Sequence, residues 1–582
     1  MFRETRHQVD FCVVGGGMAG LTAAVSAARR GAKIVLMHDR PVLGGNASSE
    51  CRVHICGADI HNRNKNMRET GILEELRLEN LARNPHANYS IWDTILYEKV
   101  MSEPSITLLL NCSCLDAKMN GDTIRSVTGW QLTTQTRHTV EARIFADCSG
   151  DGILAPLSGA RFRMGREARA EYGESIAPEQ ADARTMGMTC LFQTREYATP
   201  QPFDPPSWVR RFDKCDDLPY GANGHNWWQM GYWWIELGGE HDSIHDTEKL
   251  RDELLKITLG VWDHVKNRCP QKDKAANWAL DWLQFLPAKR ESRRFVGAHV
   301  LSQKDVEAGG RFDDLVAYGG WSMDDHHPAG FGSAAIGAPA TIFHHAPSPY
   351  GIPYRSLYSV NVRNLMFAGR NASCTHAAMS STRVMGTGCS MGQAVGTAAA
   401  MALDRQQMPA DVGGLMDELQ QELLRDDAYL PGIRQQFKDL VLRSELVASR
   451  GNPEPVRDGI NRPVGDDPHC WPCKPGDNIS YLFSGPQRIE SVTLIVDSAL
   501  DRNVTMSFHQ KDEQLHSPPG VMPETLDLDG LVNGQWQRLA EITRNHQRLV
   551  RIPVNATIEG VRFTLRATWG APESRVYAFY FD

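Results

Sequence analysis

The stretch from residue 9 to residue 40 reads VDFCVVGGGMAGLTAAVSAARRGAKIVLMHDR. Its apolar first six residues predict a strand, its alanine-rich middle predicts a helix, and IVLM near its end predicts a second strand. Gly15, Gly17 and Gly20 form a Gly-x-Gly-x-x-Gly pattern between the first strand and the helix, a setting that is typical of dinucleotide binding. Gly15 permits the turn, Gly17 lets a pyrophosphate approach the backbone, and Gly20 lets the helix pack closely. The N–H groups at the helix start favour phosphates.

The second strand ends where dinucleotide-binding folds usually place an acid that binds ribose. His38 stands there, followed by Asp39 and Arg40. A neutral imidazole accepts one hydrogen bond from a ribose hydroxyl, and Asp39 is available as a second acceptor. Arg40 fits either the 2′-phosphate of NADP or the border of the adenosine of FAD, and this motif leaves the choice open.

Three later segments favour FAD. A Gly44-Gly45-Asn46 loop follows the second strand, and the strand at residues 144–147 opens into a glycine turn with Ser149. The third segment, residues 364–388, precedes a Gly/Ala-rich helix predicted from Met391 to Leu403. The start of that helix would face the flavin pyrimidine, where negative charge gathers on reduction. FAD is longer than NAD and needs these additional close backbone contacts.

With the stretches FADCSGDG (145–152), KRESRRFVG (289–297) and NLMFAGRNASCTHAAMSSTRVMGTGCSMGQAVGTAAA (364–400), the chain resembles FAD-dependent oxidoreductases of the glutathione-reductase/fumarate-reductase flavoprotein superfamily. Some relatives are labelled xanthan lyase. The superfamily usually has glutamate where this chain has His38. The resemblance implies an enzyme with FAD as cofactor. It places the adenosine and pyrophosphate on Gly15, Gly17, Gly20, His38, Asp39, Arg40 and the backbone near Cys114, and the ribityl chain and flavin against Gly45, Asn46, Gly369, Arg370 and the turn before Met391.

The predicted fold class is α/β, with a Rossmann-type FAD-binding domain, an inserted α+β substrate domain and a C-terminal all-β jelly-roll sandwich. Short alternating strands between residues 106 and 145 predict a β-meander within the FAD domain. Regularly spaced alternating strands near the C-terminus resemble a galactose-binding-like module. The expected parts are 1–165 and 356–405 (FAD domain), 166–355 (substrate domain), 406–455 (helical cover), 456–475 (linker) and 476–582 (β-sandwich).

Charge and hydropathy exclude several partner classes. The net charge is −8 and no long basic run occurs, which argues against nucleic acid. No stretch offers about 20 consecutive apolar residues, and the polar start predicts no signal peptide. The protein is expected to be cytoplasmic, so its 13 cysteines are expected to remain thiols. The sequence is also compatible with a homo-oligomer.

The loop GGWSMDDHHP (319–328) holds the best candidate for a catalytic base. His326 fits a base whose tautomer is fixed by a partner such as Asp324, and a structural hydrogen-bonding loop is the alternative. His376 is the second candidate base. A cluster of arginines is expected to hold an anionic or polyhydroxyl substrate or to form structural ion pairs: Arg290, Arg293 and Arg294.

A tryptophan-rich stretch, HNWWQMGYWW (225–234), reads either as buried core or as a wall that stacks a sugar ring. With the base candidates and the C-terminal module it predicts oxidation of a secondary alcohol of a sugar or glycoside by hydride transfer to flavin N5. Reduction of an activated alkene in a small carboxylate is the alternative reaction. A non-catalytic carbohydrate-binding protein is the alternative of a different class.

Two cysteine patterns have spacings that occur in flavin-linkage, redox or metal sites. Cys51 to Cys56 with His54 suits a covalent flavin link through His54 or a cysteine, but a metal site would need third and fourth ligands that are not evident. Cys470 and Cys473 have the spacing of a redox pair or half a zinc site without a matching second pair, so two unrelated thiols are expected. The sequence therefore predicts no metal.

Overall fold

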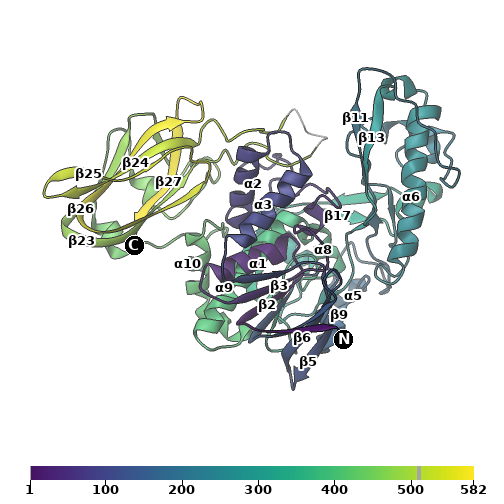
Figure 1. Ribbon diagram of the computed structural model, residues 1–582, viewed down its shortest axis with the longest axis horizontal. Coiled ribbons are helices and arrows are strands. Elements are labelled where there is room, and N and C mark those ends of the chain that lie inside the picture. Colours follow the sequence, from purple (N-terminus) through teal and green to yellow (C-terminus); the bar gives the residue numbers. More distant parts are fainter. Residues whose placement is uncertain (1, 508–512) are drawn as a thin grey trace.

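A five-stranded parallel sheet lies at the centre of the protein, in a computed structural model that describes residues 2–507 and 513–582 (Figure 1). Its inner strands are short and fully buried, as expected for a parallel sheet covered on both faces. Their order confirms the Rossmann-type fold predicted from the glycine motif. The strands run β20 (Leu365–Phe367), β8 (Ile144–Asp147), β2 (Phe11–Val14), β3 (Ile34–Met37) and β4 (Ile106–Leu109).

Helix α1 (Met18–Ala28) packs against α9 (Met385–Asp404), which follows it by more than 350 residues in the chain. A Cβ on Gly392 would lie 2.1 Å from the Ala19 carbonyl oxygen, so glycine permits this close approach. Two further helices complete this layer, α2 (Ile72–Arg83) and α3 (Tyr89–Met101). The first and last segments that carry the FAD motifs therefore form one layered unit.

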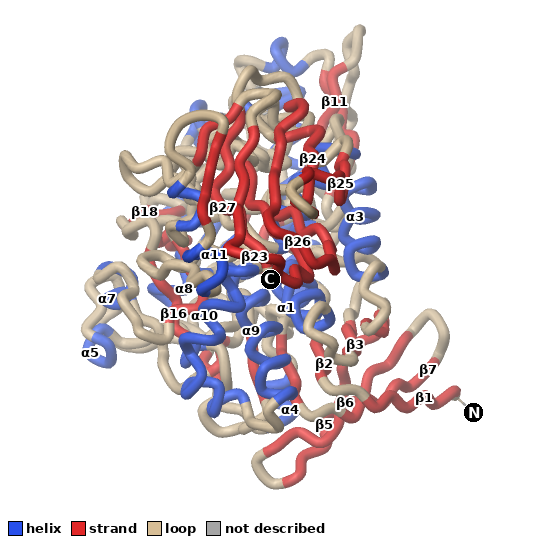
Figure 2. The backbone as a smooth tube through the Cα atoms, turned by 90° about the vertical axis from the view of Figure 1, so that its left-hand side faces the viewer, coloured by secondary structure: helices blue, strands red, loops and turns tan. Residues whose placement is uncertain are grey.

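The predicted meander is present but shorter than expected. Residues at both ends of the predicted 106–145 region form β4 and β8 of the parallel sheet, because their apolar side chains are buried there. The polar N-terminus, which the sequence suggested would lead directly into the first apolar strand, instead pairs in parallel with the meander. This sheet consists of β1 (Arg3–Gln8), β7 (Thr136–Glu141), β6 (Thr123–Gln131) and β5 (Cys112–Asn120), and extends from the body in Figure 2.

The inserted region combines short strands with one long helix, α6 (Thr247–Asp263), which lies beside β11 and β13 at the right of Figure 1. Its core contains Tyr232 and Trp234, whose rings stack at 4.9 Å. The three-stranded sheet is β12 (Glu236–Leu237), β10 (Met188–Thr189) and β14 (Ala288–Lys289). The two-stranded antiparallel sheets are β11 (Phe192–Glu196) with β13 (Trp278–Leu283), β16 (Leu315–Gly319) with β19 (Tyr350–Pro353), β17 (Met323–His326) with β18 (Thr341–His344), and β9 (Phe162–Arg163) with β15 (Arg294–Phe295).

The C-terminal part is all-β, as predicted, and its strands pair antiparallel around a separate apolar core. The sequence analysis placed Cys470 and Cys473 in a linker without regular structure, and this was wrong. Residues 471–473 form a strand paired with β27, and both thiols are buried. The strand order is β22 (Trp471–Cys473), β27 (Ser574–Phe581), β23 (Asn478–Val496), β26 (Leu549–Thr568), β24 (Pro523–Val532) and β25 (Gln535–Ile542), with β21 (Glu445–Ala448) beside β23.

Buried arginines tie this β-rich part to the parallel-sheet body. Arg68 pairs with Glu74 at 2.7 Å and donates to the carbonyl oxygen of Ser498 at 3.1 Å. Arg548 pairs with Asp427 at 2.9 Å. Removing one partner of a buried ion pair leaves an uncompensated charge, so these contacts oppose separation of the two parts. The remaining helices are α4 (Leu154–Ser158), α5 (Arg169–Tyr172), α7 (Gln303–Glu307), α8 (His376–Thr382), α10 (Met416–Arg425) and α11 (Asp439–Arg443).

Candidate functional site

Two glycines of the motif, one in the turn before α1 and one in the first turn of the helix, have no room for a side chain. Gly15 has a φ of +106°, and a Cβ there would lie 2.4 Å from the backbone nitrogen of Ser149. A Cβ on Gly20 would lie 1.8 Å from the Gly15 carbonyl oxygen. These contacts give Gly15 and Gly20 the turn and packing roles that the motif predicts.

Gly17 differs from its neighbours because the space in front of it is open. Among the described residues, a Cβ on Gly17 would meet nothing nearer than the Cα of Gly45, at 4.0 Å. Gly369 and Gly388 also approach this helix start, and a Cβ on Gly388 would lie 3.6 Å from the Gly369 Cα. Glycines from separate segments thus form a cradle of bare backbone at the N-terminus of α1. Such a cradle fits the pyrophosphate and ribityl chain of FAD, because helix N–H groups favour the negative phosphates.

His38 supports the glycine turn in the structure. Its Nδ1 accepts a hydrogen bond from the Gly16 N–H at 3.0 Å, and its Nε2 lies 3.0 Å from the Val42 carbonyl oxygen. Burial lowers the pKa of His38 to about 4, so the ring is neutral. Both nitrogens are engaged with backbone, which leaves neither for the ribose hydroxyl suggested by the sequence. Asp39, with a side chain 61% exposed, is the remaining acceptor at this strand end.

The residues expected around adenosine lie close together. The Cys112 N–H donates to the His38 carbonyl oxygen at 2.8 Å, which sets the start of β5, including Cys114, beside the end of β3. Arg40 lies 3.8 Å from Glu50. The structure therefore gathers Asp39, Arg40 and Cys114 at one end of the glycine cradle.

Arg370 belongs to a buried charge network beside Asn46. Asp151 accepts from Arg370 at 2.7 Å and from Lys289 at 2.8 Å. Burial raises the pKa of Asp151, but the two cations outweigh burial and hold it below its ordinary value. The Asn46 side chain donates to the Lys289 carbonyl oxygen at 3.2 Å. The Arg370 Nη1 is buried without a hydrogen-bond partner in the described chain, as expected for a donor that faces a ligand.

Strand β17 carries the predicted base and separates its two aspartates. Successive side chains of a strand point to opposite faces, so Asp324 and His326 share one face and Asp325 occupies the other. His326 Nδ1 lies 2.6 Å from a Glu236 carboxylate oxygen, and its Nε2 lies 3.4 Å from Asp324. This geometry gives His326 two carboxylate neighbours, of which Glu236 is much the closer.

Two arginines complete the His326 group. Arg383 lies 3.2 Å from Asp324, and Arg290 lies 3.3 Å from Glu236. Burial raises the pKa of Asp324, but His326 and Arg383 outweigh burial and hold it below its ordinary value. Asp324 is therefore an anion at neutral pH. We define the His326 network as Glu236, Arg290, Asp324, His326 and Arg383.

His376 forms a second histidine–carboxylate group at the start of α8. Its Nδ1 lies 2.8 Å from Glu291 and its Nε2 lies 3.1 Å from Asp325. Burial lowers the pKa of His376, but the two carboxylates outweigh burial and raise it to about 10. At neutral pH this imidazole is protonated, so the structure favours His376 as a fixed cation or acid and not as the alternative base.

This raised pKa predicts a stability that depends on pH. The contribution of protonated His376 to folding is fully present below pH 6.5, its ordinary pKa, and is lost as the pH rises through about 10. We expect His376→Gln to lower the thermal midpoint most near pH 6, with the difference from wild type shrinking toward pH 10. A pH series of melting curves measures this. His245→Gln, at a 75% exposed side chain, is the control; a constant His376→Gln difference across the series would contradict the prediction.

The arginines predicted from KRESRR separate into different roles. Arg293 reaches the Asp151 carbonyl oxygen at 3.3 Å and covers the Phe162 ring, away from His326. Arg294 is fully buried in ion pairs with Glu291 and Glu167. Of the three, Arg290 alone is a member of the His326 network. A polar substrate bound by this network would therefore contact Arg290 and not Arg293.

Met391 lies inside α9 and not at its start. The helix begins six residues earlier, at Met385, and Met391 is buried in the main core. The expected start was wrong because Gly386 and Gly388 usually disfavour helix, whereas here both lie in the helix and Gly386 packs closely against Glu69. A Cβ on Gly386 would lie 2.6 Å from the Glu69 carboxylate.

The tryptophan-rich stretch supplies both core and site residues. Tyr232 and Trp234 are buried, whereas Trp233 is half-buried and its ring meets that of His326 edge-on at 5.6 Å. These residues form a turn, closed by the Ile235 N–H donating to the Tyr232 carbonyl oxygen at 3.1 Å. The interpretation as core therefore holds for Tyr232 and Trp234, and stacking of a sugar ring on Trp233 stays a prediction.

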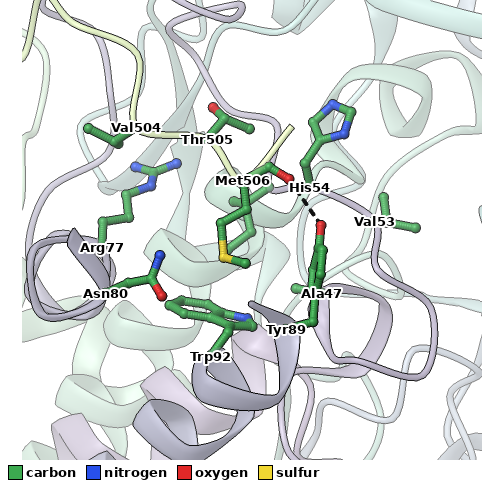
Figure 3. A pocket seen from close by; sticks show the side chains of 11 residues that line it. Ala47, Val53, His54, Arg77, Asn80, Tyr89, Trp92, Val504, Thr505 and Met506 are labelled. Carbon is green, nitrogen blue, oxygen red and sulfur yellow. Dashed lines mark hydrogen bonds between the residues drawn. The ribbon is translucent and has the colours of Figure 1, made fainter. Parts of the chain in front are cut away.

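A small pocket lies between the loop after Asn46, helices α2 and α3, and the C-terminal part (Figure 3). Tyr89 donates to the Met506 carbonyl oxygen there at 3.0 Å. His54 lines the same pocket, and His61 brings its Nε2 to 3.8 Å from Cys56 Sγ. His61 is therefore a third candidate metal ligand beside His54 and Cys56, without a distinct signal in the sequence.

A covalent flavin link through His54 or a cysteine stays a prediction. It is checked by whether flavin remains with acid-precipitated protein.

Sequence reasoning missed the carboxylates that orient the histidines. Glu236 and Glu291 lie 90 and 85 residues from the histidines they contact. Glu236 follows the tryptophan-rich stretch, and Glu291 stands inside KRESRR, but a single glutamate in either place carries no distinct signal. Arg383 stands inside the glycine-containing segment before α9 and likewise carries no distinct signal.

Comparisons with known proteins give a match over most of the chain. A family model described as FAD dependent oxidoreductase matches residues 10–423. A curated fumarate reductase (cytochrome) from Shewanella frigidimarina is 56% identical over 39 residues, which cover 7% of this chain and only 7% of that protein's length.

Two solved structures give partial, low-scoring likenesses. A geranylgeranyl bacteriochlorophyll reductase-like protein from Thermoplasma acidophilum is 12% identical with a TM-score of 0.32, covering 72% of this chain and 86% of its own. A family 32 carbohydrate-binding module from Streptococcus pneumoniae is 12% identical with a TM-score of 0.20, covering 25% of this chain and 99% of its own. Among the described residues, the helices lack the length and apolarity needed to cross a membrane.

Proposed function

Because the chain belongs to the FAD dependent oxidoreductase family, we propose that it oxidises a secondary alcohol of a sugar or glycoside, with His326 as the base. The cofactor is FAD, and the residues that would hold it are Gly15, Gly17, Gly20, Asp39, Arg40, Gly45, Asn46, the backbone near Cys114, Ser149, Gly369 and Arg370. Bound FAD supplies a hydride acceptor at N5. The catalytic base and the substrate contacts must come from the protein.

The observation that carries the proposal is the unequal pair of contacts on His326. Glu236 at 2.6 Å accepts from Nδ1–H, so in the neutral form of His326 the lone pair is on Nε2. The Nε2 contact with Asp324 is long, at 3.4 Å, and Asp324 is also held by Thr341 at 2.7 Å. A substrate hydroxyl that reaches Nε2 can therefore replace Asp324 as the neighbour of that nitrogen. His326 would accept the hydroxyl proton, and Glu236 would stabilise the resulting imidazolium.

The surroundings of His326 suit a polyhydroxyl substrate. Arg290 and Arg383 offer donors, and Asp324 offers acceptors, within a mostly buried group. Trp233 presents an apolar ring to the same histidine. An apolar ring beside fixed polar groups is a common arrangement for carbohydrate binding, because sugar rings have apolar faces and polar edges.

A second reaction, reduction of an activated alkene in a small carboxylate, is favoured by the same two arginines. Two guanidinium groups near one another suit a carboxylate clamp. The acid for this reaction would be His326, because protonated His376 contacts Asp325 on the opposite face of β17. The two reactions run in opposite redox directions, so an experiment separates them.

The test is an anaerobic titration that follows flavin absorbance. Oxidised enzyme is mixed with a panel of sugars and glycosides, and chemically reduced enzyme is mixed with a panel of enoates. The proposal predicts bleaching by at least one sugar or glycoside. Failure of every sugar to bleach the flavin, together with reoxidation by an enoate, would establish the second reaction instead.

A further inference from the structure

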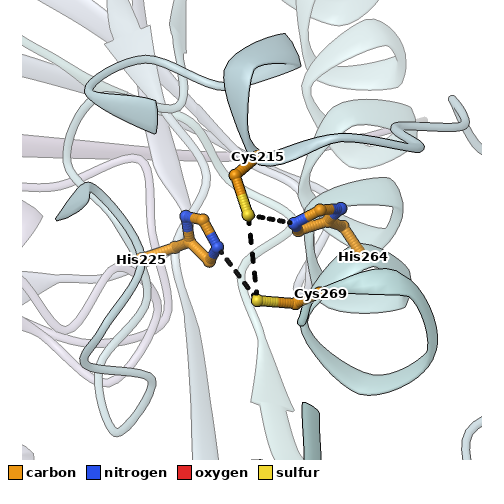
Figure 4. Close-up of side chains that lie close together, drawn as sticks. All are labelled: Cys215, His225, His264 and Cys269. Carbon is orange, nitrogen blue, oxygen red and sulfur yellow. Dashed lines mark hydrogen bonds between the residues drawn. The ribbon is translucent and has the colours of Figure 1, made fainter. Parts of the chain in front are cut away.

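Two cysteines and two histidines meet at the end of α6, in the inserted region (Figure 4). Their candidate ligand atoms all lie within 4.8 Å of one another. Three of the four residues are buried, and the fourth is half-buried. We call this group the Cys2His2 cluster: Cys215, His225, His264 and Cys269.

The distances in the cluster fit a single tetrahedral ion. Zinc bonds of about 2.3 Å to sulfur and about 2.0–2.1 Å to nitrogen place two sulfurs about 3.8 Å apart and sulfur about 3.6 Å from nitrogen. The two Sγ atoms are 3.9 Å apart. Cys215 Sγ lies 3.5 Å from His264 Nε2, and Cys269 Sγ lies 3.4 Å from His225 Nε2.

The backbone around the cluster orients both imidazoles. His225 Nδ1 lies 3.0 Å from the Gly221 carbonyl oxygen, and His264 Nδ1 lies 3.0 Å from that of Phe212. Nδ1–H groups that donate to carbonyls leave the Nε2 lone pairs for a metal, as in protein zinc sites. The Gln271 N–H also donates to Cys269 Sγ at 3.4 Å.

A single π-helical turn brings two of the ligands together. Residues 264–268 continue α6 with this wider turn, and the Cys269 N–H donates to the His264 carbonyl oxygen at 2.7 Å. Such turns are rare and often mark functional positions. The turn therefore gives an independent indication that His264 and Cys269 are held for a purpose.

We propose that the Cys2His2 cluster binds one structural zinc ion. Two thiolates and two neutral imidazoles in a tetrahedron select zinc among common metals. Four protein ligands leave no open position for water or substrate, so the role is structural and not catalytic. The sequence analysis predicted no metal, because the ligands are spread over 55 residues and the two pairs lack a familiar spacing.

The zinc would hold the tryptophan-rich stretch in place. Tyr232 donates to the His225 carbonyl oxygen at 3.3 Å, and Trp234 donates to that of Gly224 at 2.9 Å. Trp233 lies between them and meets His326. Zinc at the cluster thus supports one wall of the candidate site, but its presence does not depend on which substrate the enzyme oxidises.

The experiment measures metal in untagged, FAD-loaded protein by elemental mass spectrometry and X-ray absorption. We expect about one zinc per chain, with sulfur neighbours at about 2.3 Å and nitrogen neighbours at about 2.0–2.1 Å. Cys215→Ser and Cys269→Ser should each lower the bound zinc at least about tenfold after dialysis against a mild chelator. Cys190→Ala, which changes a buried cysteine of the inserted region outside the cluster, should retain it.

The measurement on wild-type protein remains decisive if a variant fails to fold. Wild-type protein that contains no zinc and takes none up would overturn the proposal. A disulfide between Cys215 and Cys269 in denatured, alkylated protein, or iron in place of zinc, would also overturn it. Flavin content is measured in parallel, so loss of zinc is distinguished from loss of FAD.

Discussion

Gly17→Val is expected to abolish FAD binding while the apoprotein stays folded. The backbone at Gly17 has a φ of −65°, which valine adopts without strain, and its Cβ would meet no described atom nearer than 4.0 Å. The substitution therefore fits the protein but fills the space in which a pyrophosphate approaches the helix N-terminus. We expect FAD affinity to fall at least about 100-fold, or about 2.8 kcal/mol.

The measurement is the flavin absorbance of purified protein together with titration of apoprotein with FAD. Gly485→Val is the matched control, because the described structure has open space around that glycine in the C-terminal β part. It should retain flavin. Melting curves of the two apoproteins should agree within a few degrees. Wild-type affinity in folded Gly17→Val would show that the cofactor does not lie on this turn.

His326→Gln should slow flavin reduction by the substrate about 10²–10⁴-fold with little change in substrate binding. Glutamine keeps a polar side chain but cannot accept the hydroxyl proton. Stopped-flow reduction under anaerobic conditions separates the rate of reduction from the apparent substrate affinity. An unchanged rate of reduction in His326→Gln would eliminate this residue as the base.

Glu236 is expected to act by positioning His326. Glu236→Gln should lower the rate less than His326→Gln and should shift the pH dependence of reduction, because the imidazolium loses its carboxylate partner. The neighbouring His327 is the control position, because its side chain accepts from the Ala329 N–H and makes no other hydrogen bond among the described residues. His327→Asn should reduce flavin at nearly the wild-type rate.

The cofactor fold could be predicted from sequence because its determinants are local. Gly15 needs a positive φ, Gly20 packs against the Gly15 carbonyl oxygen, and Gly17 leaves the backbone open to a phosphate, so the three roles leave a pattern at fixed spacing. The apolar runs that became β2, β3, β8 and β20 were visible for the same reason. Family, cofactor and fold class follow from these segments, and the family match confirms them.

Two expectations, the ribose contact of His38 and the start of α9, failed because contacts in the folded chain outweigh the local sequence pattern. His38 stands where a ribose ligand is expected, but the Gly16 N–H and the Val42 carbonyl engage both nitrogens and turn the ring inward. The start of α9 was misplaced because Gly386 and Gly388 suggest a turn. In the folded chain they form the first helical turn against Glu69 and Gly369.

The sequence by itself determined that the chain binds FAD through a Rossmann-type unit and carries a separate all-β C-terminal part. Only the tertiary structure decided which acids serve His326 and His376, that Arg293 and Arg294 lie outside the His326 network, and that the Cys2His2 cluster exists. The physical reason is distance along the chain. Hydrogen bonds, ion pairs and metal bonds depend on atoms a few ångströms apart, and residues 50 to 90 positions apart reach that separation only after the layers have packed.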